Sequence, residues 1–385
     1  MKICDIVMNS VWYDPRVRKQ IMEYCRRGVD VVCIGYECPR YDAEKISEMP
    51  CRTKVVMRDK RFLGKQKFVI RKFIRERIKN RAVCEAIVEE KPDVIHANDL
   101  DALIPAYMAA KRVNARIVYD SHEICVKNNS LIGKPLYSKY LEFRERFLCK
   151  KVDQMVCVSN AAADYFAKKY RIRRPLVITN CTLKSEQILG RAVQKHEGFE
   201  ILNHGQYYAG RGFEMLPLVL PLINDYPEIK LAIRGFGKLE PSIHAAVEAQ
   251  KNADQFIFYP PVLVKELIPE ASKSHVGVAI TVPLCLNFEL SVSNKLFEYA
   301  AAGLPVIMSN IPEHCYLNDK YKFGIVLEDD TPECFAKAVK KLYLDEEFYR
   351  KCVKGAKKMS DEVNWENSFD TLIRIEQGWV EEKEC

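Results

Sequence analysis

Short apolar runs alternate with longer stretches of helical periodicity along this chain. The first 36 residues show the pattern, with the apolar run KICDIVM, the helix-like segment RVRKQIMEYCRRG, and then the apolar run VDVVCIGY. Further strand candidates in the first half are residues 93–98, 115–121, 154–159 and 175–180. Strands and helices that alternate in this way predict an α/β fold built on parallel, doubly wound sheets.

The alternation restarts after a polar stretch at residues 182–197. Between about residues 199 and 310 the strand candidates are EILNHG, IKLAIRG, QFIFYP, VGVAIT and PVIMS. We therefore expect two Rossmann-like domains facing a cleft, the first at residues 1–185 and the second at 195–360. The tail at 361–385 has an amphipathic helical pattern and could pack back on the first domain.

Several predicted strands end in a polar residue just where the next helix should begin. The pairs are Asn9–Ser10, Asn98–Asp99, Ser121–His122 and Ser159–Asn160. In doubly wound sheets, ligands bind beyond the carboxyl ends of the strands. These positions are therefore the first candidates for a binding site.

The composition narrows the class of protein. A chain of 385 residues with 48% apolar residues can bury two ordinary cores. Its 15 cysteines form no CxxC pair and no Cys/His cluster at zinc spacing, which indicates a reducing compartment and no metal site. The first fifteen residues have the pattern of a strand rather than a signal peptide, and no apolar run has the length of a membrane span.

The net charge of +8 is unevenly distributed. Residues 58–81 hold eleven Lys/Arg against two acids, and Ile70, Phe73, Ile74 and Ile78 follow helical spacing within them. One interpretation is a solvated helix whose apolar stripe packs on its own domain. The other is contact with an anionic membrane surface or a phospholipid-linked acceptor. Nucleic acid is disfavoured, because aromatic residues do not interleave with the basic ones and no nucleic-acid motif is present.

The second half begins with NHGQYYAGRGFE, in which three glycines follow a strand and precede a predicted helix. Gly205, Gly210 and Gly212 would let the backbone approach a phosphate, and Arg211 would add a bidentate ligand. A tight turn between a strand and a helix needs glycines too. The spacing is neither GxGxxG nor a Walker loop, so both interpretations stay open.

The stretch SVSNKLFEYAAAGLPV, residues 291–306, predicts a second helix start with a charged face. Helical spacing puts Asn294, Lys295 and Glu298 on one side, at an end where backbone N–H groups favour an anion. Ser293 lacks the acid three residues later that a capping box requires. The alternative is an ordinary surface helix with an i,i+3 ion pair and a Gly303 cap.

Seven segments taken in order resemble a known family of enzymes. They are DPRVRKQ, VIHANDLDALIPA, IVYDSHE, VCVSN, VITNC, GRGFE and NKLFEYAAAGLPVI. The set is similar to the GT-B fold retaining glycosyltransferases of family 4, which build bacterial surface polysaccharides. The resemblance implies a metal-independent hexosyl transfer, without a cofactor, from a UDP-, GDP- or other nucleoside diphosphate sugar. The implied acceptor is a glycan or lipid-linked hydroxyl. The cysteine pattern and the basic segment at 58–81 predict a cytoplasmic location, peripheral on the inner face of the cell membrane.

The resemblance also assigns roles to residues of the second half. Glu298 would bind the ribose hydroxyls, while Arg211 and Lys295 would neutralise the diphosphate. The nucleotide-sugar site would further include Gly210, Gly212, Ser293, Asn294 and Glu289. The family often has two glutamates separated by seven residues; here position 290 is leucine and Glu289 lies one residue early.

In the first half, His122 resembles the family histidine that contacts the donor sugar and phosphate, and Glu123 could orient its ring. The alternative for His122 is a cap on the end of a strand. Asn9 and Arg16 match the loop that receives the acceptor. Arg16 could instead simply follow a helix capped by Asp14, with Pro15 in the first turn.

Asp99-Leu100-Asp101 resembles the metal-binding DxD triplet of the other large glycosyltransferase fold. Because it opens a predicted helix, where acidic residues are favourable anyway, we interpret it as a structural cap and expect no metal. Two other functions stay open. One is a sugar-nucleotide 2-epimerase, and the other is a non-catalytic GT-B nucleotide-binding protein in a polysaccharide assembly complex.

Overall fold

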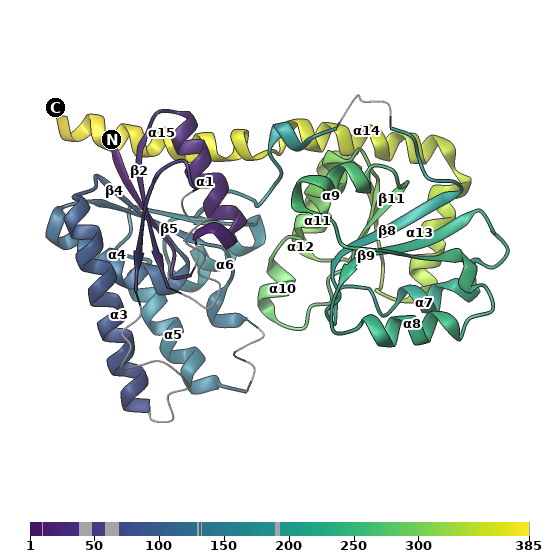
Figure 1. The fold of residues 1–385 in the computed structure, drawn as a ribbon, viewed down its shortest axis with the longest axis horizontal. Coiled ribbons are helices and arrows are strands. Elements are labelled where there is room, and N and C mark those ends of the chain that lie inside the picture. The colour runs from purple at the N-terminus through teal and green to yellow at the C-terminus, as the bar shows by residue number, and fades with distance from the viewer. Residues whose placement is uncertain are drawn as a thin grey trace. The chain divides into compact units, whose positions relative to one another are not determined.

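The computed structural model describes residues 1–9, 11–37, 48–57, 69–128, 131, 133–188 and 193–384. The chain divides into two compact units, one formed by Met1–Ile178 with Ser368–Cys385 and the other by Thr179–Asn367. Each unit packs helices around one parallel sheet (Figure 1). Two doubly wound α/β domains, the fold predicted from the alternating pattern, are therefore confirmed.

Within the described residues, the sheet of the first unit has seven parallel strands in the order β3-β2-β1-β4-β5-β6-β7. They are β1 (Lys2–Ile6), β2 (Asp30–Tyr36), β3 (Arg52–Val56), β4 (Val94–Asn98), β5 (Arg116–Ser121), β6 (Gln154–Cys157) and β7 (Leu176–Val177). The helices described in the main segment of this unit, Met1–Ile178, are α1 (Pro15–Arg26), α3 (Val69–Glu90), α4 (Asp99–Val113), α5 (Pro135–Leu148) and α6 (Asn160–Tyr170), with 3-10 turns η1 (Val11–Tyr13) and η3 (Cys125–Lys127). The strand order reverses between β1 and β4, which pair directly.

The second unit repeats this topology with six described strands in the order β10-β9-β8-β11-β12-β13. They are β8 (Phe199–Gln206), β9 (Ile229–Phe236), β10 (Phe256–Tyr259), β11 (Val276–Ala279), β12 (Val306–Met308) and β13 (Gly324–Val326). The α-helices are α7 (Leu216–Val219), α8 (Glu240–Glu248), α9 (Val264–Ala271), α10 (Leu286–Leu290), α11 (Asn294–Ala301), α12 (Pro312–Tyr321), α13 (Pro332–Leu344) and α14 (Glu346–Glu362). Three 3-10 turns, η5 (Lys184–Glu186), η6 (Leu220–Ile223) and η7 (Ala253–Gln255), complete the unit as described.

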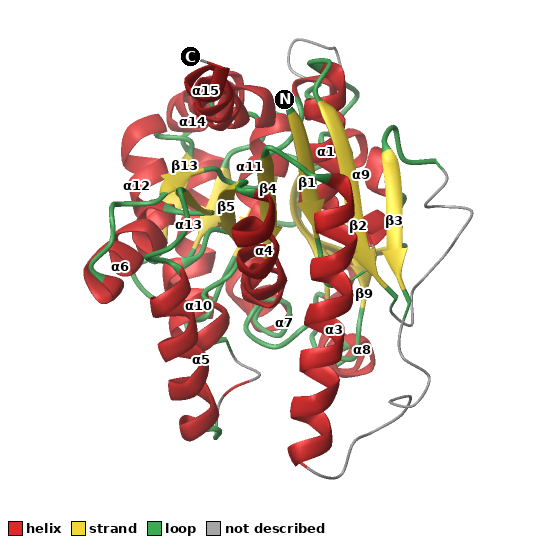
Figure 2. Ribbon diagram, turned by 90° about the vertical axis from the view of Figure 1, so that its left-hand side faces the viewer, coloured by secondary structure: helices red, strands yellow, loops and turns green. Residues whose placement is uncertain are grey.

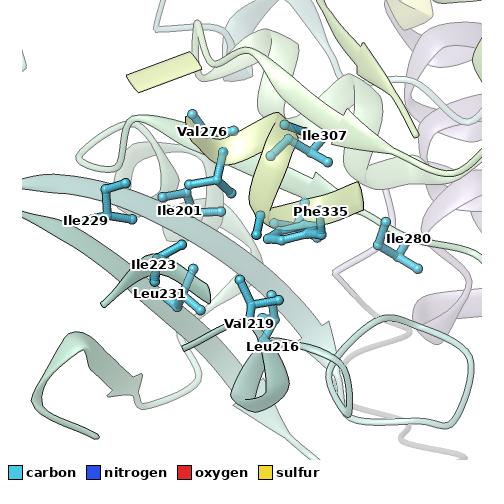
Figure 3. Close-up of a cluster of buried hydrophobic side chains, with 14 of the residues drawn as sticks. Ile201, Leu216, Val219, Ile223, Ile229, Leu231, Val276, Ile280, Ile307 and Phe335 are labelled. Carbon is cyan, nitrogen blue, oxygen red and sulfur yellow. The ribbon is translucent and has the colours of Figure 1, made fainter. Parts of the chain in front are cut away.

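A continuous apolar core fixes the second sheet against its helices (Figure 3). Ile201, Leu231 and Val276 come from neighbouring strands and lie on the same side as Phe335 of α13. Burying each such side chain contributes about 1.5–3 kcal/mol. This packing holds the carboxyl ends of β8 and β11 in a fixed position, which matters for the site described below.

The last helix, α15 (Trp365–Glu384), returns to the first unit and packs on α1. The Tyr24 hydroxyl donates to the Glu376 carboxylate at 2.8 Å, and the Tyr24 ring meets Phe369 edge to face at 5.0 Å. Arg27 and Asp370 form an ion pair of 2.6 Å. The first unit thus ends its main segment at Ile178 rather than at 185, and it takes its final helix from the end of the chain.

Three strands differ from the sequence prediction. β3 was not predicted because Arg52 and Lys54 interrupt its apolar positions at the edge of the sheet, and β13 was not predicted because it has only three residues. β7 is confined to Leu176–Val177, although the apolar run covers 175–180. Edge strands bury less side-chain surface, so their apolar signal is weaker.

The basic segment lies partly outside the described residues, at 58–68. Its remainder forms the first half of α3, as its helical spacing predicted. Among its apolar residues, Ile74 is exposed and Ile78 is half-buried. Across the described ranges, every helix is too short or too polar to cross a membrane.

Candidate functional site

The second sheet has a topological switch point between β8 and β11. These strands pair with each other, while β8 pairs with β9 on its other side and β11 pairs with β12. The connections that leave their carboxyl ends therefore diverge, which opens the crevice where doubly wound sheets bind ligands. The residues predicted for the nucleotide sugar follow these two strands in the chain.

Asn203 joins two of these segments. Its fully buried side chain accepts a hydrogen bond of 2.6 Å from Lys295 Nζ and donates to the Arg211 carbonyl at 3.2 Å. One amide thus fixes both the ammonium near the start of α11 and the turn that carries Arg211. The sequence motifs do not include Asn203; its only signal in the sequence is a polar residue at a buried position of a predicted strand.

Glu298 lies one turn after Lys295 on α11. Its Oε2 is 2.7 Å from Nε2 of His204, a buried residue near the end of β8. The His204 ring stacks on Tyr299 at 4.4 Å, and the Tyr299 hydroxyl donates to the Leu202 carbonyl. The carboxylate is therefore oriented by a buried ring while 26% of its side chain stays exposed, which suits an acceptor of hydroxyl protons.

Arg211 extends along the same crevice. Its guanidinium lies 4.6 Å from the centre of the Phe288 ring, with Nη1 3.5 Å from Thr281 Oγ1. Stacking on an aromatic ring fixes the plane of the guanidinium, the group that proteins use for bidentate phosphate binding. Glu289 is the next residue of α10 and is exposed. A contact between Glu289 and the donor stays a prediction.

The glycine turn after β8 has a steric cause. Gly210 and Gly212 have φ of 77° and 79°, and a Cβ on Gly212 would lie 2.6 Å from Cβ of Ile280. The tight-turn interpretation therefore explains both glycines. The helix that we expected to follow is short: α7 starts at Leu216 and has four residues. This turn consequently lacks the long helix whose N-terminal dipole was expected to face a phosphate.

A buried histidine anchors the N-terminus of α11. Ser293 caps this helix without a side-chain hydrogen bond, which agrees with the missing capping box. Its backbone N–H instead donates to Nε2 of His314 at 3.4 Å, and Nδ1 of His314 lies 3.2 Å from the Ser309 carbonyl. Burial lowers the pKa of His314 to about 4, so the neutral ring can accept at Nε2. Asn294 follows at the first helical position and is exposed.

The electrostatics of this crevice favour an anion. Burial lowers the pKa of the Lys295 ammonium to about 7, and the neighbouring Arg211 charge lowers it as well, against the opposite effect of Glu298. The Lys295 ammonium has lost part of its hydration and lies near the positive charge of Arg211, so a nearby anion would stabilise it. A bound diphosphate would supply that charge and restore the pKa of Lys295 toward its ordinary value.

In the first unit, His122 directly follows the carboxyl end of β5. Its Nε2 lies 3.1 Å from Asn98 Oδ1, and its backbone N–H donates to Asp99 at 3.0 Å. The carboxylate of Glu123, which we expected to orient the ring, accepts instead from Asn128. Asn98 is therefore the residue that orients His122.

Arg16, which was predicted to lie on the acceptor side, is buried. Its buried guanidinium makes two hydrogen bonds of 2.9 Å to Asp120 and a third to the Ile178 carbonyl. Burial raises the pKa of Asp120, but the Arg16 and His122 charges outweigh that effect and hold it well below its usual range. Asp14 caps α1, with Pro15 in its first turn, as the alternative predicted. The placement supports a structural ion pair rather than acceptor binding by Arg16.

Asn9 is exposed in the loop after β1, and its carbonyl accepts from the Tyr36 backbone N–H at 3.2 Å. Gly35 leaves room for the loop that contains Asn9 and Val11, because a Cβ at position 35 would lie 2.8 Å from Cγ2 of Val11. The loop is therefore packed against β2 with the Asn9 position at its surface. Acceptor binding by Asn9 stays a prediction.

The two aspartates of the DLD triplet have separate surroundings. Asp99 opens α4 with a φ of 65°, and its carboxylate braces the backbone of His122 instead of capping its own helix. Asp101 lies 3.8 Å from Lys79 of α3. In the part of the chain that the structure describes, no three His, Cys, Asp or Glu side chains are grouped to hold a metal ion. Metal independence of the reaction stays a prediction.

The two parallel-sheet domains define the class: this is the GT-B fold of glycosyltransferases. Residues 16–182 match the family described as Glycosyltransferase Family 4, and residues 198–345 match the family described as glycosyl transferases group 1. These matches and the fold together support a glycosyltransferase with the GT-B fold. No curated protein matches the chain in sequence.

Solved structures share the fold over nearly the whole chain. A glycosyltransferase from Rickettsia africae ESF-5 superposes with a TM-score of 0.77 at 13% identity, covering 98% of both chains. Anabaena Alr3699/HepE in complex with UDP gives 0.73 at 14% identity, covering 98% of this chain and 100% of that one. A putative UDP-N-acetylglucosamine 2-epimerase from Listeria monocytogenes gives 0.66 at 11% identity, covering 99% and 97%.

The lowered pKa of Lys295 predicts that binding of a nucleoside diphosphate takes up a proton. At about pH 8 the Lys295 amine is mostly neutral in the free protein, whereas UDP is already fully ionised. Bound diphosphate raises the pKa again, so about one proton is taken up and the affinity falls as the pH rises above 7. Titration calorimetry of UDP in buffers of different ionisation enthalpy measures the uptake. The Lys295→Gln variant should show none, and an uptake of zero in the unsubstituted protein would contradict the assignment.

Proposed function

We propose that this protein transfers a hexose-type sugar from a nucleoside diphosphate sugar to an acceptor hydroxyl, with retention of the anomeric configuration. The observation that carries the proposal is the grouping of Arg211, Lys295 and Glu298 around Asn203 and His204 at the switch point of the second sheet. The donor is a UDP-, GDP- or related sugar. The acceptor is a glycan, lipid-linked or polysaccharide, presented at the cytoplasmic face of the cell membrane.

The chemistry follows from where charge develops. The bond between the anomeric carbon and the diphosphate oxygen breaks while a bond to the acceptor oxygen forms on the same face. The leaving diphosphate takes the acceptor proton, so no protein base or nucleophile is assigned. Arg211, Lys295 and the first backbone N–H groups of α11 stabilise the growing negative charge, and they are already in position before it develops.

The remaining roles are positioning roles toward the donor. Glu298 accepts from the ribose hydroxyls, and His204 holds its carboxylate in place. Asn98 fixes the ring of His122, and a contact of this ring with the donor stays a prediction. Ser293 and Asn294 present the start of α11, where His314 holds the backbone.

Two other functions share parts of this architecture. A 2-epimerase has the same fold, as the Listeria neighbour illustrates, but its chemistry needs acids and bases around the sugar ring. A non-catalytic protein would bind the nucleotide without turnover. The arrangement of two cations and one oriented carboxylate suits the binding of a nucleoside diphosphate and is compatible with all three functions.

An assay with a panel of nucleotide sugars and no acceptor separates the three functions. We expect slow release of free sugar and nucleoside diphosphate, because a transferase lets water replace its acceptor at a low rate. Appearance of the C2 epimer would instead indicate an epimerase, and binding without any product would indicate a non-catalytic protein. We expect the same rates in EDTA; loss of activity in EDTA with recovery in manganese would return Asp99 and Asp101 to consideration as ligands.

Glu298 should contribute far more to turnover than Glu289. His204 orients Glu298 at the crevice, whereas Glu289 lies exposed on α10. We expect Glu298→Gln to lower kcat/KM roughly tenfold to hundredfold, the effect of losing a charged hydrogen bond of about 1.5–3 kcal/mol. Glu289→Gln, the matched control, should stay within about threefold. A larger loss from Glu289→Gln would mean that the family pattern is shifted by one residue here.

A further inference from the structure

Helix α5 exposes large apolar side chains on its outer face. The stripe consists of Leu136, Tyr140, Phe143 and Phe147, with Tyr137 at its edge. Their spacing of four, three and four residues puts the first four on one side of the helix. Leu136 is 82% exposed and Phe143 is 72% exposed. A solvent-facing row of this kind is unusual for a helix that also has a buried face.

The opposite face of α5 is fixed to the domain. Buried Glu145 accepts hydrogen bonds from the hydroxyls of Tyr119 at 2.7 Å and Tyr170 at 2.5 Å. Burial raises the pKa of Glu145 to about 7. Leu148 is buried as well. Because these contacts set the rotation of the helix, the apolar stripe cannot turn inward without breaking them.

The stripe continues onto neighbouring helices. Phe147 meets Tyr107 of α4 edge to face at 6.4 Å. Arg144 pairs with Glu76 of α3 at 2.9 Å and lies over the Tyr140 ring. In Figures 1 and 2, α3 and α5 extend from the sheet on the same side. We call the set Leu136, Tyr137, Tyr140, Phe143 and Phe147, together with Tyr107 of α4, the α5 surface.

Cations border the α5 surface, and the nearby acids are paired. Lys139 and Arg146 flank the stripe on α5 and are exposed. Lys111 and Lys151 lie against its aromatic residues, at 4.7 Å from the Tyr107 ring and 6.0 Å from the Phe147 ring. Glu142 is bound by two lysines of its own, at 3.0 and 2.7 Å. The border of the stripe is therefore positive.

We propose that the α5 surface docks on the anionic headgroup region of a membrane. Aromatic side chains with a polar tip fit the boundary between headgroups and acyl chains, and basic residues beside them are attracted to anionic lipid. A helix lying in that boundary needs one apolar face and cationic flanks, which α5 has. The contact does not depend on catalysis; it rests on the proposed function only in bringing a lipid-linked acceptor within reach.

A second copy of the chain fits the α5 surface less well. A helix of 14 residues is about 21 Å long, and a single stripe on it is far smaller than the ~800 Å² per partner of a stable interface. A two-fold contact would also bring like charges toward each other. An anionic bilayer attracts the cations instead of repelling them, and a helix can bind it without the contact area that a stable dimer needs.

The sequence pointed to the neighbouring helix instead. The charge of the basic segment at 58–81 predicted a membrane contact there, yet among the side chains described at 74–81 the exposed large apolar residue is Ile74. The stripe of α5 was not singled out because the same spacing is typical of a helix that faces a core. Only the burial of Glu145 and Leu148 shows which side of α5 faces inward.

Vesicle co-sedimentation of the full chain tests the proposal. We expect binding to phosphatidylcholine vesicles containing phosphatidylglycerol, reversal by high salt, and no binding to phosphatidylcholine alone. The variant Tyr140→Ser/Phe143→Ser/Phe147→Ser should bind at least about tenfold more weakly. The matched control Leu263→Ser/Val264→Ser/Leu344→Ser removes exposed apolar residues of the second unit and should bind as the unsubstituted chain does. Lys139→Glu/Arg146→Glu should also lose about tenfold or more.

Three results would overturn the proposal. They are no binding to anionic vesicles at low salt, equal loss in the aromatic variant and its control, and a dimer that the aromatic variant dissolves without any vesicle binding. Circular dichroism and thermal unfolding of each variant check that it is folded. Calorimetry with UDP tests the proposed function separately, because the nucleotide residues lie in the other unit. If UDP fails to bind while vesicle binding behaves as expected, the proposed function fails and the α5 surface stands.

Discussion

The hydrogen bond from Lys295 to Asn203 holds the site of the second unit together. At 2.6 Å, it keeps an ammonium in a position where burial lowers its pKa, and the same amide secures the turn that carries Arg211. The two cations are thus fixed by one buried side chain near the end of β8. Groups fixed in this way reorganise little when negative charge develops, so they can stabilise a leaving diphosphate.

In both units a buried asparagine side chain joins two segments of the site. In the first sheet, Asn98 at the end of β4 donates to Asp5 at 2.7 Å and lies 3.1 Å from His122. In the second sheet, Asn203 accepts the corresponding hydrogen bond from Lys295. An amide has both donors and acceptors, so a single buried asparagine can join two segments that follow different strands. The repeated parallel topology places each of these residues beside a switch point.

Much of this arrangement can be predicted from the sequence, and the rest depends on distant contacts. Buried parallel strands leave continuous apolar runs, so most strands were found, while the polar edge strand β3 was not. Helical spacing alone put Lys295 and Glu298 on one face. Their partners come from β8, more than ninety positions away in the sequence, and no local pattern joins them. For Arg16 the sequence shows a cation but not the buried Asp120 that binds it.

The central claim is that the switch point of the second sheet binds the diphosphate of the donor. The most direct test is titration calorimetry of UDP against Arg211→Ala, with Arg350→Ala on the exposed face of α14 as control. Removing the Arg211 guanidinium should cost about 1.5–3 kcal/mol of binding, roughly a tenfold to hundredfold rise in Kd, because a charged hydrogen bond to phosphate is lost. The control should not change the Kd. An unchanged Kd for Arg211→Ala would contradict the account.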